Sequence, residues 1–598
     1  MPPLVETTCT VLLLLALGLP QQKADTQSRT PADREATERK ALVLLDQLSD
    51  DAGSFADGEL KVRIQSQVAN MLWRYDEPRA RRQFEAAFQA IASTSLPPQD
   101  KSVPPSYVGA DSHYPLRNDV IRMVAERDPT FAAKLVDSVI DLPPNVDPKF
   151  HGYTSYSESD MLRFQFALYI TTTDPQRAAQ IARAFLQKGD THRAVTIARS
   201  LRGKDATLAD ALFAGALSQV KQRHALSTEN VRELAMYLFP DFGEGVILFT
   251  SGSGNRNRAE LTRASPALMA QFFDLAGDAV TEWTAEPQTT AGADARGGVR
   301  APVDYTIAKL LLPYFDRYAP DKSAALRARL DAALRRPMTG DERRLADSRA
   351  GTVQELLSRA QAATDGREKD RLYLMAAMQA ARSHDLSEAP AILGKISDER
   401  TRAQADSFLR YAAEDKRRQE AQSAMDSADW ETADRLIHEM TDKLNRFYML
   451  SNLAVALSSH GEKARALSVL DEAGQLSGTI EDGIQRAEAM VHLASLSVRL
   501  DPRRGFDDMR LAVAAINRAG FAPQWQKIET ITDEKSGTTR RVQVGLEALS
   551  SGLLNSSLSL LGAYDFDRAL ALTKEIEMKE VRALAQLAIC RGALRPAQ

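Results

Sequence analysis

The stretch RFYMLSNLAVALSSHGEKARAL (residues 446–467) decides the expected fold. Its apolar residues recur at helical spacing as far as Leu457, a Ser-His-Gly turn follows, and a second helical pattern begins near Lys463. Apolar residues at i, i+3, i+4 and i+7 indicate an amphipathic helix, and a polar cluster with glycine indicates a turn. Two such helices cannot bury their apolar faces alone, so the stretch predicts a helix pair that stacks on neighbouring pairs.

The same arrangement recurs elsewhere in the chain: an Arg opens an apolar helix, a turn follows, and a small residue sits inside the next helix. It is found in RLYLMAAMQAARSHDLSEA (371–389), RFQFALYITTTDPQRA (163–178) and RAEAMVHLASLSVRLDPRRG (486–505). Helical periodicity continues from about Thr37 almost to the end of the sequence. We therefore expect an all-α fold, an α-solenoid built of antiparallel helix pairs.

The unit from Leu450 to Ala473 resembles a tetratricopeptide repeat. Leu450, Leu453, Ala454 and Leu457 occupy the large-large-small-large positions of that family's first helix, and Ala466, Leu470 and Ala473 match its second helix. The match covers one unit: Gly505 stands where alanine is expected, and no regular 34-residue period runs through the chain. The resemblance implies a right-handed solenoid that binds a peptide or a protein in a concave groove.

Two segments interrupt the helical pattern. Residues 282–303 are rich in Thr, Ala and Gly, which is typical of a flexible linker or a long loop. Residues 527–544 alternate apolar and polar positions around Lys-Ser-Gly, which predicts a β-hairpin insertion. The expected organisation is a probable signal peptide (1–22), a polar N-terminal linker (23–37), a helical-repeat region (38–281), the linker (282–303) and a second helical-repeat region (304–598).

The charge balance gives no reason to expect a nucleic-acid partner. The chain has 76 basic and 80 acidic residues and a formal net charge of −4, so it lacks the global positive field that draws proteins to polyanions. The sequence also has no segment long and apolar enough to predict an integral membrane span.

The N-terminal sequence favours export. The apolar run from Val11 to Leu19 has the length of a signal-peptide core and is short for a bilayer span, although Glu6 precedes it and no Lys or Arg does. We expect a periplasmic or secreted protein, and a cytoplasmic one if the run is not an export signal. Removal of the signal would remove Cys9 and leave Cys590 as the one cysteine, so no intramolecular disulfide is expected.

Motifs for metal binding and nucleophilic catalysis are not recognisable. His438 to Asp442 (HEMTD) approaches a zinc-binding motif but lacks its spacing, and Ser253 lacks the setting of a nucleophile elbow. His384 and His460 each follow a first helix, where a histidine interacts favourably with the helix dipole. We therefore expect neither metal nor cofactor. Paired carboxylates from distant loops remain possible, because Asp and Glu are too numerous to single out a pair.

Two long loops in the first third of the chain carry the candidate binding residues. Each loop joins the second helix of one pair to the first helix of the next, so both emerge on one edge of the solenoid. Long loops with Tyr are suited to binding, because Tyr offers contact area and a polar tip at low entropic cost; the alternative is that they cap the apolar stack. The candidate residues are Tyr107, His113, Tyr114, His151, Tyr153 and Tyr156.

The expected function is that of a non-catalytic, exported helical-repeat protein that serves as a protein-binding or scaffolding module in the bacterial envelope. A protein or peptide is the expected partner, and a glycan is the other possible ligand. The alternative from a different class is a helical-repeat carbohydrate-active enzyme with a loop-lined cleft, for which paired carboxylates about 5 to 10 Å apart would be the signature. A cytoplasmic scaffold is the third possibility.

Overall fold

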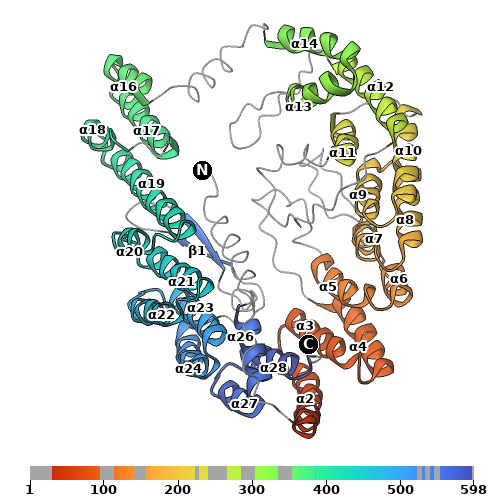
Figure 1. The fold of residues 1–598 in the computed structure, drawn as a ribbon, viewed down its shortest axis with the longest axis vertical. Coiled ribbons are helices and arrows are strands. Elements are labelled where there is room, and N and C mark those ends of the chain that lie inside the picture. The colour runs from red at the N-terminus through yellow and green to blue at the C-terminus, as the bar shows by residue number, and fades with distance from the viewer. Residues whose placement is uncertain are drawn as a thin grey trace. The chain divides into compact units, whose positions relative to one another are not determined.

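A computed structural model describes residues 30–94, 113–140, 157–222, 228–239, 265–283, 303–334, 353–383, 386–521, 528–532, 539–543 and 553–595. Nearly all of these residues are helical, and successive helices pack on one another (Figure 1). The expectation of an all-helical repeat architecture is therefore confirmed at the level of paired, stacked helices.

The chain divides into two compact units, and the first of them, unit 1, holds the described residues 113–334. Its helices pack in sequence order, so that each pair contacts the next along the chain. The helices are α5 (Tyr114–Ala125), α6 (Pro129–Asp137), α7 (Glu158–Tyr169), α8 (Pro175–Lys188), α9 (Thr191–Arg202), α10 (Ala206–Gln222), α11 (Thr228–Leu238), α12 (Pro266–Trp283), α13 (Val303–Tyr318) and α14 (Pro320–Leu334).

The second unit, unit 2, joins the two ends of the chain, since it holds the described residues 30–94 and 353–595. Its N-terminal helices are α2 (Pro31–Ala52), α3 (Gly58–Leu72), α4 (Glu77–Ala90) and the short 3₁₀ turn η1 (Ile91–Ser93). Its remaining helices are α16 (Val353–Ala362), α17 (Gly366–Ser383), α18 (Ala389–Lys395), α19 (Glu399–Asp426), α20 (Trp430–His438), α21 (Lys443–Ser459), α22 (Lys463–Ser477), α23 (Gly483–Leu500), α24 (Pro502–Ala519), α26 (Leu553–Tyr564), α27 (Phe566–Lys574) and α28 (Lys579–Ala593).

The predicted regions of the chain can be compared with the two compact units only in part. All but the first two residues and the last of the predicted linker 282–303 lie outside the described residues. Contacts group residues 30–94 with the C-terminal helices, whereas the predicted regions 38–281 and 304–598 follow sequence order. The predicted signal peptide and residues 23–29 of the N-terminal linker also lie outside the described residues, whereas residues 31–37 of that linker belong to α2, and the predicted boundaries remain predictions.

A recurring aspartate explains why so many helix pairs turn at the same point. Its backbone N–H closes the first helix by donating to a carbonyl four or five residues back, at 2.7–2.9 Å, and its carboxylate accepts a backbone N–H of the next helix at 2.9–3.2 Å. One residue therefore ends one helix with its backbone and begins the next with its side chain. These turn aspartates are Asp76, Asp128, Asp174, Asp190, Asp205, Asp429, Asp501 and Asp565.

Three glycines allow unusually close helix contacts in unit 2. A Cβ placed on Gly505 would lie 2.5 Å from Val498 Cγ2, so α23 and α24 are packed more closely than an alanine would permit. Where α26 crosses α28, a Cβ on Gly592 would lie 1.8 Å from the Ser559 carbonyl oxygen, and one on Gly562 would lie 2.7 Å from the Ile589 carbonyl oxygen. The glycine at 505, which departs from the tetratricopeptide pattern, is thus required by the packing.

The unit that resembles a tetratricopeptide repeat is phased as predicted. It forms the pair α21 and α22, and Leu450, Leu453, Ala454, Leu457, Ala466, Leu470 and Ala473 are all buried. Ala454 and Ala466 are fully buried at 0% exposure, which agrees with the prediction that facing helices approach closely there. The packing supports a helical repeat, whereas membership of the tetratricopeptide family remains a prediction.

The first and last described helices pack against each other, and we call α2, α3, α26, α27 and α28 together the clasp. One hydrophobic cluster contains Ala41, Leu45 and Leu60 from the N-terminal side and Ala585 and Ile589 from α28. Figure 1 shows α2, drawn in red, beside α28, drawn in dark blue. Because α2 and α28 are in contact, the helical stack continues from the C-terminal end of the chain into its N-terminal end.

Polar contacts reinforce the clasp. The Lys40 ammonium binds the Asp567 carboxylate at 2.8 Å, and Arg591 donates to Gln67 Oε1 at 2.8 Å. The thiol of Cys590 is fully buried at 0% exposure and donates to the Ala41 carbonyl oxygen at 3.6 Å. Burial raises the pKa of Cys590 to about 12, which keeps the thiol protonated at neutral pH.

The described residues also contain two short strands, β1 (Ile528–Thr532) and β2 (Thr539–Gln543), within the segment 527–544. They pair antiparallel, with Ile528 opposite Gln543 and Thr532 opposite Thr539. The intervening residues 533–538 lie outside the described part of the chain.

Candidate functional site

The structure describes two of the six predicted binding residues. His113 and Tyr114 open α5, whereas Tyr107, His151, Tyr153 and Tyr156 lie outside the described residues. His113 occupies the N-cap position of α5, and its carbonyl accepts the Arg117 backbone N–H at 3.0 Å. The proposed edge of six residues therefore remains a prediction.

Tyr114 faces the interior of unit 1, where it is 7% exposed. Burial, with a smaller effect of the nearby Tyr169 phenol, raises the pKa of Tyr114 to about 12, although a hydrogen bond with Gln165 and the Arg193 charge act in the opposite direction. A side chain held in this way contributes to packing between helices. Tyr114 is thus not one of the exposed anchors that the loop argument requires.

Polar contacts join the first helices of consecutive pairs in unit 1. Between α5 and α7, Arg117 binds Glu158 at 2.9 Å with both side chains mostly buried, and the Tyr169 hydroxyl donates to Asn118 Oδ1 at 3.2 Å. Breaking a mostly buried ion pair leaves an uncompensated charge, so this contact fixes the relative position of α5 and α7.

Between α9 and α11 lies a histidine held by a buried carboxylate. His192 Nδ1 is 3.0 Å from Glu233 Oε2, and Arg232 donates to Glu233 Oε1 at 2.8 Å. Burial raises the pKa of Glu233, yet the hydrogen bonds and charges of His192 and Arg232 outweigh burial and leave that pKa below its usual value. The His192 side chain is 51% exposed and that of Glu233 is 2% exposed, so a buried anion orients an imidazole that reaches solvent. General bases use this geometry, but they also need a substrate beside the imidazole.

Helix α23 carries two perturbed titratable groups one turn apart. His492 is 7% exposed, and the rings of Phe447 and Tyr448 contact it edge-on with centroids 5.9 and 5.5 Å away. Burial, with a smaller effect of the Arg499 charge, lowers the pKa of His492 to about 4.

Glu488 precedes His492 by one helical turn. Burial and the neighbouring Asp482 carboxylate raise the pKa of Glu488 to about 7. His492 is therefore uncharged near neutral pH, whereas Glu488 titrates there.

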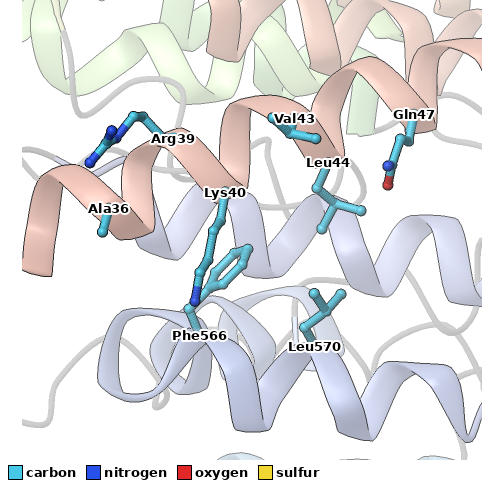
Figure 2. Close-up of a pocket in the computed structure, with 8 residues that line it drawn as sticks. All are labelled: Ala36, Arg39, Lys40, Val43, Leu44, Gln47, Phe566 and Leu570. Atoms are coloured by element: carbon cyan, nitrogen blue, oxygen red, sulfur yellow. The ribbon is translucent and has the colours of Figure 1, made fainter.

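A shallow groove lies on the clasp, between α2 and α27. Its volume is about 490 Å³, and it is lined by Ala36, Arg39, Lys40, Val43, Leu44, Gln47, Phe566 and Leu570. Figure 2 shows Leu44 and Leu570 pointing toward each other across it, Lys40 extending alongside Phe566, and Arg39 and Val43 projecting from α2 away from α27. Val43 is 58% exposed, which is unusual for a large apolar residue in the described part of the chain. The groove can hold an apolar side chain next to a positive charge.

Two histidines that the sequence singled out have ordinary helix-surface roles. His438 Nε2 is 2.8 Å from Glu472, and its Nδ1 contacts the Asp434 carbonyl at 2.8 Å. His460 ends α21, where its Nδ1 contacts the Ala456 carbonyl at 2.9 Å. His384 and Ser253 lie outside the described residues.

The described residues contain neither a cluster of metal ligands nor a helix that could span a membrane. No group of three or more His, Cys, Asp or Glu side chains in them is placed to hold a metal ion. None of the helices in the same part of the chain combines the length and the apolar character needed to cross a bilayer.

The His192–Glu233 pair and the groove on the clasp could not be predicted from the hydrophobic periodicity of the sequence. His192 and Glu233 are far apart in the sequence, and the groove joins residues 36–47 to residues 566–570. No spacing rule links such pairs. The local signal for the groove is Val43, an apolar residue beside the charged face of its helix, and that signal is weak by itself.

Comparisons with known proteins give little. The sequence matches no family description and no curated protein. Among solved structures, the chain is similar to a "Circular tandem repeat protein with novel repeat topology and enhanced subunit contact surfaces", with 11% sequence identity over 94% of this chain and 96% of that chain. The TM-score is 0.11, so this likeness carries no argument about shape or function.

Proposed function

We propose that this protein is a helical-repeat binding or scaffolding module of the bacterial envelope, that its units are right-handed tetratricopeptide-like stacks, and that it binds a protein partner without chemistry of its own. The observation that carries the proposal is the groove on the clasp, where Val43 is 58% exposed at the surface of an otherwise well-packed helical stack. A concave surface lined by apolar side chains is a candidate binding site. The apolar run from Val11 to Leu19 supports export.

The proposal is tested by affinity capture from envelope extracts with the full-length chain, followed by N-terminal sequencing of the protein from fractionated cells. We expect a protein partner in the captured material and a mature protein that lacks the first residues. Recovery of the intact chain from the cytoplasm would refute the export part of the proposal. A glycan ligand with turnover would refute its non-catalytic part.

The predicted loop edge is tested in the same capture experiment. Substitution of both Tyr153 and Tyr156 with Ala should weaken capture by more than about 1 kcal/mol if these residues are anchors. Early melting with unchanged capture would instead mean that the two aromatic side chains cap the helical stack.

A carbohydrate-active enzyme is the second candidate, and one observation favours it. The pKa of Glu488, about 7, is suited to a general acid. Glycoside hydrolysis needs a second carboxylate, and the neighbouring Asp482 carboxylate is engaged as the N-cap of α23, accepting backbone N–H groups of Ile484 and Gln485 at 3.0 Å. Release of reducing ends from envelope glycans that disappears in Glu488→Gln would establish the enzyme. Equal signals from the two proteins would exclude Glu488 as its acid.

A further inference from the structure

We propose that the groove between α2 and α27 binds an acidic amphipathic helix of a partner protein, and that this binding is coupled to closure of the clasp. This inference rests on the proposed binding function and names its site and the chemistry of its partner. It concerns unit 2 alone, which contains both walls of the groove.

The shape of the groove fits a helix. The lining residues of α2 fall at positions 36, 39, 40, 43, 44 and 47, so they follow one stripe along the helix. The eleven steps from position 36 to position 47, at about 1.5 Å each, give a stripe of roughly 16 Å, or about three helical turns. An amphipathic helix that inserts apolar residues at i, i+3/i+4 and i+7 matches such a stripe.

The lining supplies an apolar contact and a charge. Phe566 and Leu570 from α27 and Leu44 from α2 provide the apolar surface, and Val43 extends it at the rim. Lys40 is already neutralised by Asp567 at 2.8 Å. Arg39 is exposed and has no ion pair among the described residues. A carboxylate next to the apolar anchors of the partner would therefore pair with Arg39, whereas a lysine there would be repelled.

The groove exists only while the clasp is closed. One wall is α2, near the N-terminal end of the chain, and the other is α27, near the C-terminal end. A ligand that binds the closed form alone must stabilise it, by an amount that follows from ligand concentration and affinity. Cys590 reports closure, because its buried thiol contacts Ala41 of α2 and can react only when α28 separates from α2.

The experiment uses the full-length protein with Cys9→Ser, so that Cys590 is the single thiol. Its probe is a fluorescent 16-residue helical peptide with Leu at i, i+3/i+4 and i+7 and Glu at the flanking positions. Measurements are peptide anisotropy and the rate of maleimide labelling of Cys590. At ten times the Kd, the peptide should slow labelling about tenfold. A peptide with Lys in place of every Glu should bind at least tenfold more weakly.

Two variants locate the site, and a third is the matched control. Val43→Asp should abolish binding and protection, and Arg39→Glu should reverse the preference between the two peptides. Leu511→Asp should change neither, since Leu511 of α24 is as exposed as Val43, at 58%, and does not line the groove. Circular dichroism should be the same for all three, because the substituted side chains are exposed.

Four results would overturn the inference. They are equal binding of both peptides, binding that survives Val43→Asp, self-association of the protein that Val43→Asp abolishes, and binding to anionic phospholipid vesicles in place of the peptide. If envelope capture yields a partner that Val43→Asp retains, the groove is not its site and the scaffold proposal stands. If the peptide binds but no partner is captured, the groove binds the predicted ligand class and the scaffold proposal fails.

Discussion

Gly592→Ala should open the clasp, because α26 and α28 cross there at a distance that excludes a methyl group. The new Cβ would lie 1.8 Å from the Ser559 carbonyl oxygen, 2.7 Å from its carbonyl carbon and 3.0 Å from Ala563 N. These are backbone atoms of the facing helix, so no side chain can rotate away and the helices must move apart. Overpacking of this kind costs about 1–3 kcal/mol. We expect the upper part of that range, because Gly562 on the other helix faces Ile589 in the same crossing.

The assay is maleimide labelling of Cys590 in a protein whose other cysteine, Cys9, is Ser. A global melting curve is a poor measure for a chain of two units, whereas the buried thiol of Cys590, two residues before Gly592 on α28, reports displacement of α28 from α2. A loss of about 2–3 kcal/mol should raise the labelling rate roughly 30- to 150-fold when opening precedes reaction. Gly394→Ala is the matched control, because a Cβ there meets nothing within 4 Å. Unchanged labelling in Gly592→Ala would refute the reasoning.

Three further predictions concern helix packing, turns and pH. Ala454→Phe should destabilise unit 2 by about 1–3 kcal/mol, because Ala454 is 0% exposed; unchanged urea unfolding would mean that α21 tolerates the larger side chain. Asp174→Ala should lower the free energy of unfolding by about 0.5–2 kcal/mol, because the Asp174 carboxylate caps α8 by accepting the Arg177 backbone N–H at 3.0 Å. Amide hydrogen exchange should become faster in the first turn of α8. Faster exchange confined to other helices would contradict the capping role. The pKa of His492, about 4, lies below the unfolded value near 6.5, so the unfolded chain binds the extra proton and stability should fall as pH drops from about 6.5 to 4. His492→Gln should flatten that part of the pH–stability curve, and an unaltered curve would assign the loss to other groups.

Local patterns predicted the elements that depend on neighbours in sequence. The pair formed by α21 and α22 was predictable because Leu450, Leu453 and Leu457 recur at helical spacing and all three are buried. Three of the turn aspartates, Asp128, Asp174 and Asp501, carry a similar local signal, because each is followed by Pro, which is favoured in the first turn of a helix. The structure thereby explains the regular turns that the sequence shows.

Contacts between distant segments were not predictable from these patterns. Lys40 and Asp567 are 527 positions apart, and periodicity contains no information about which apolar faces meet. Gly592 does not have the left-handed backbone conformation that favours glycine. Glycine is needed there because the Ser559 backbone of the facing helix leaves no room for a Cβ. Tyr114 was assigned to a loop surface by its position before a helix, but the first turn of α5 directs it inward.

The contact between α2 and α28 in the clasp can form only late in synthesis of the chain. Helices α2 and α3 are translated well before α26 and α28, which form the surface that covers them. At about 5–20 residues per second, the 527 positions between Lys40 and Asp567 take roughly 30 to 100 seconds to synthesise. During that interval the apolar side of α2, including Ala41, Leu45 and Leu48, lacks the helix that finally buries it. Nascent chains of this protein should therefore need a holding chaperone until α28 has been synthesised, and truncation shortly before α28 should produce a species that chaperones retain.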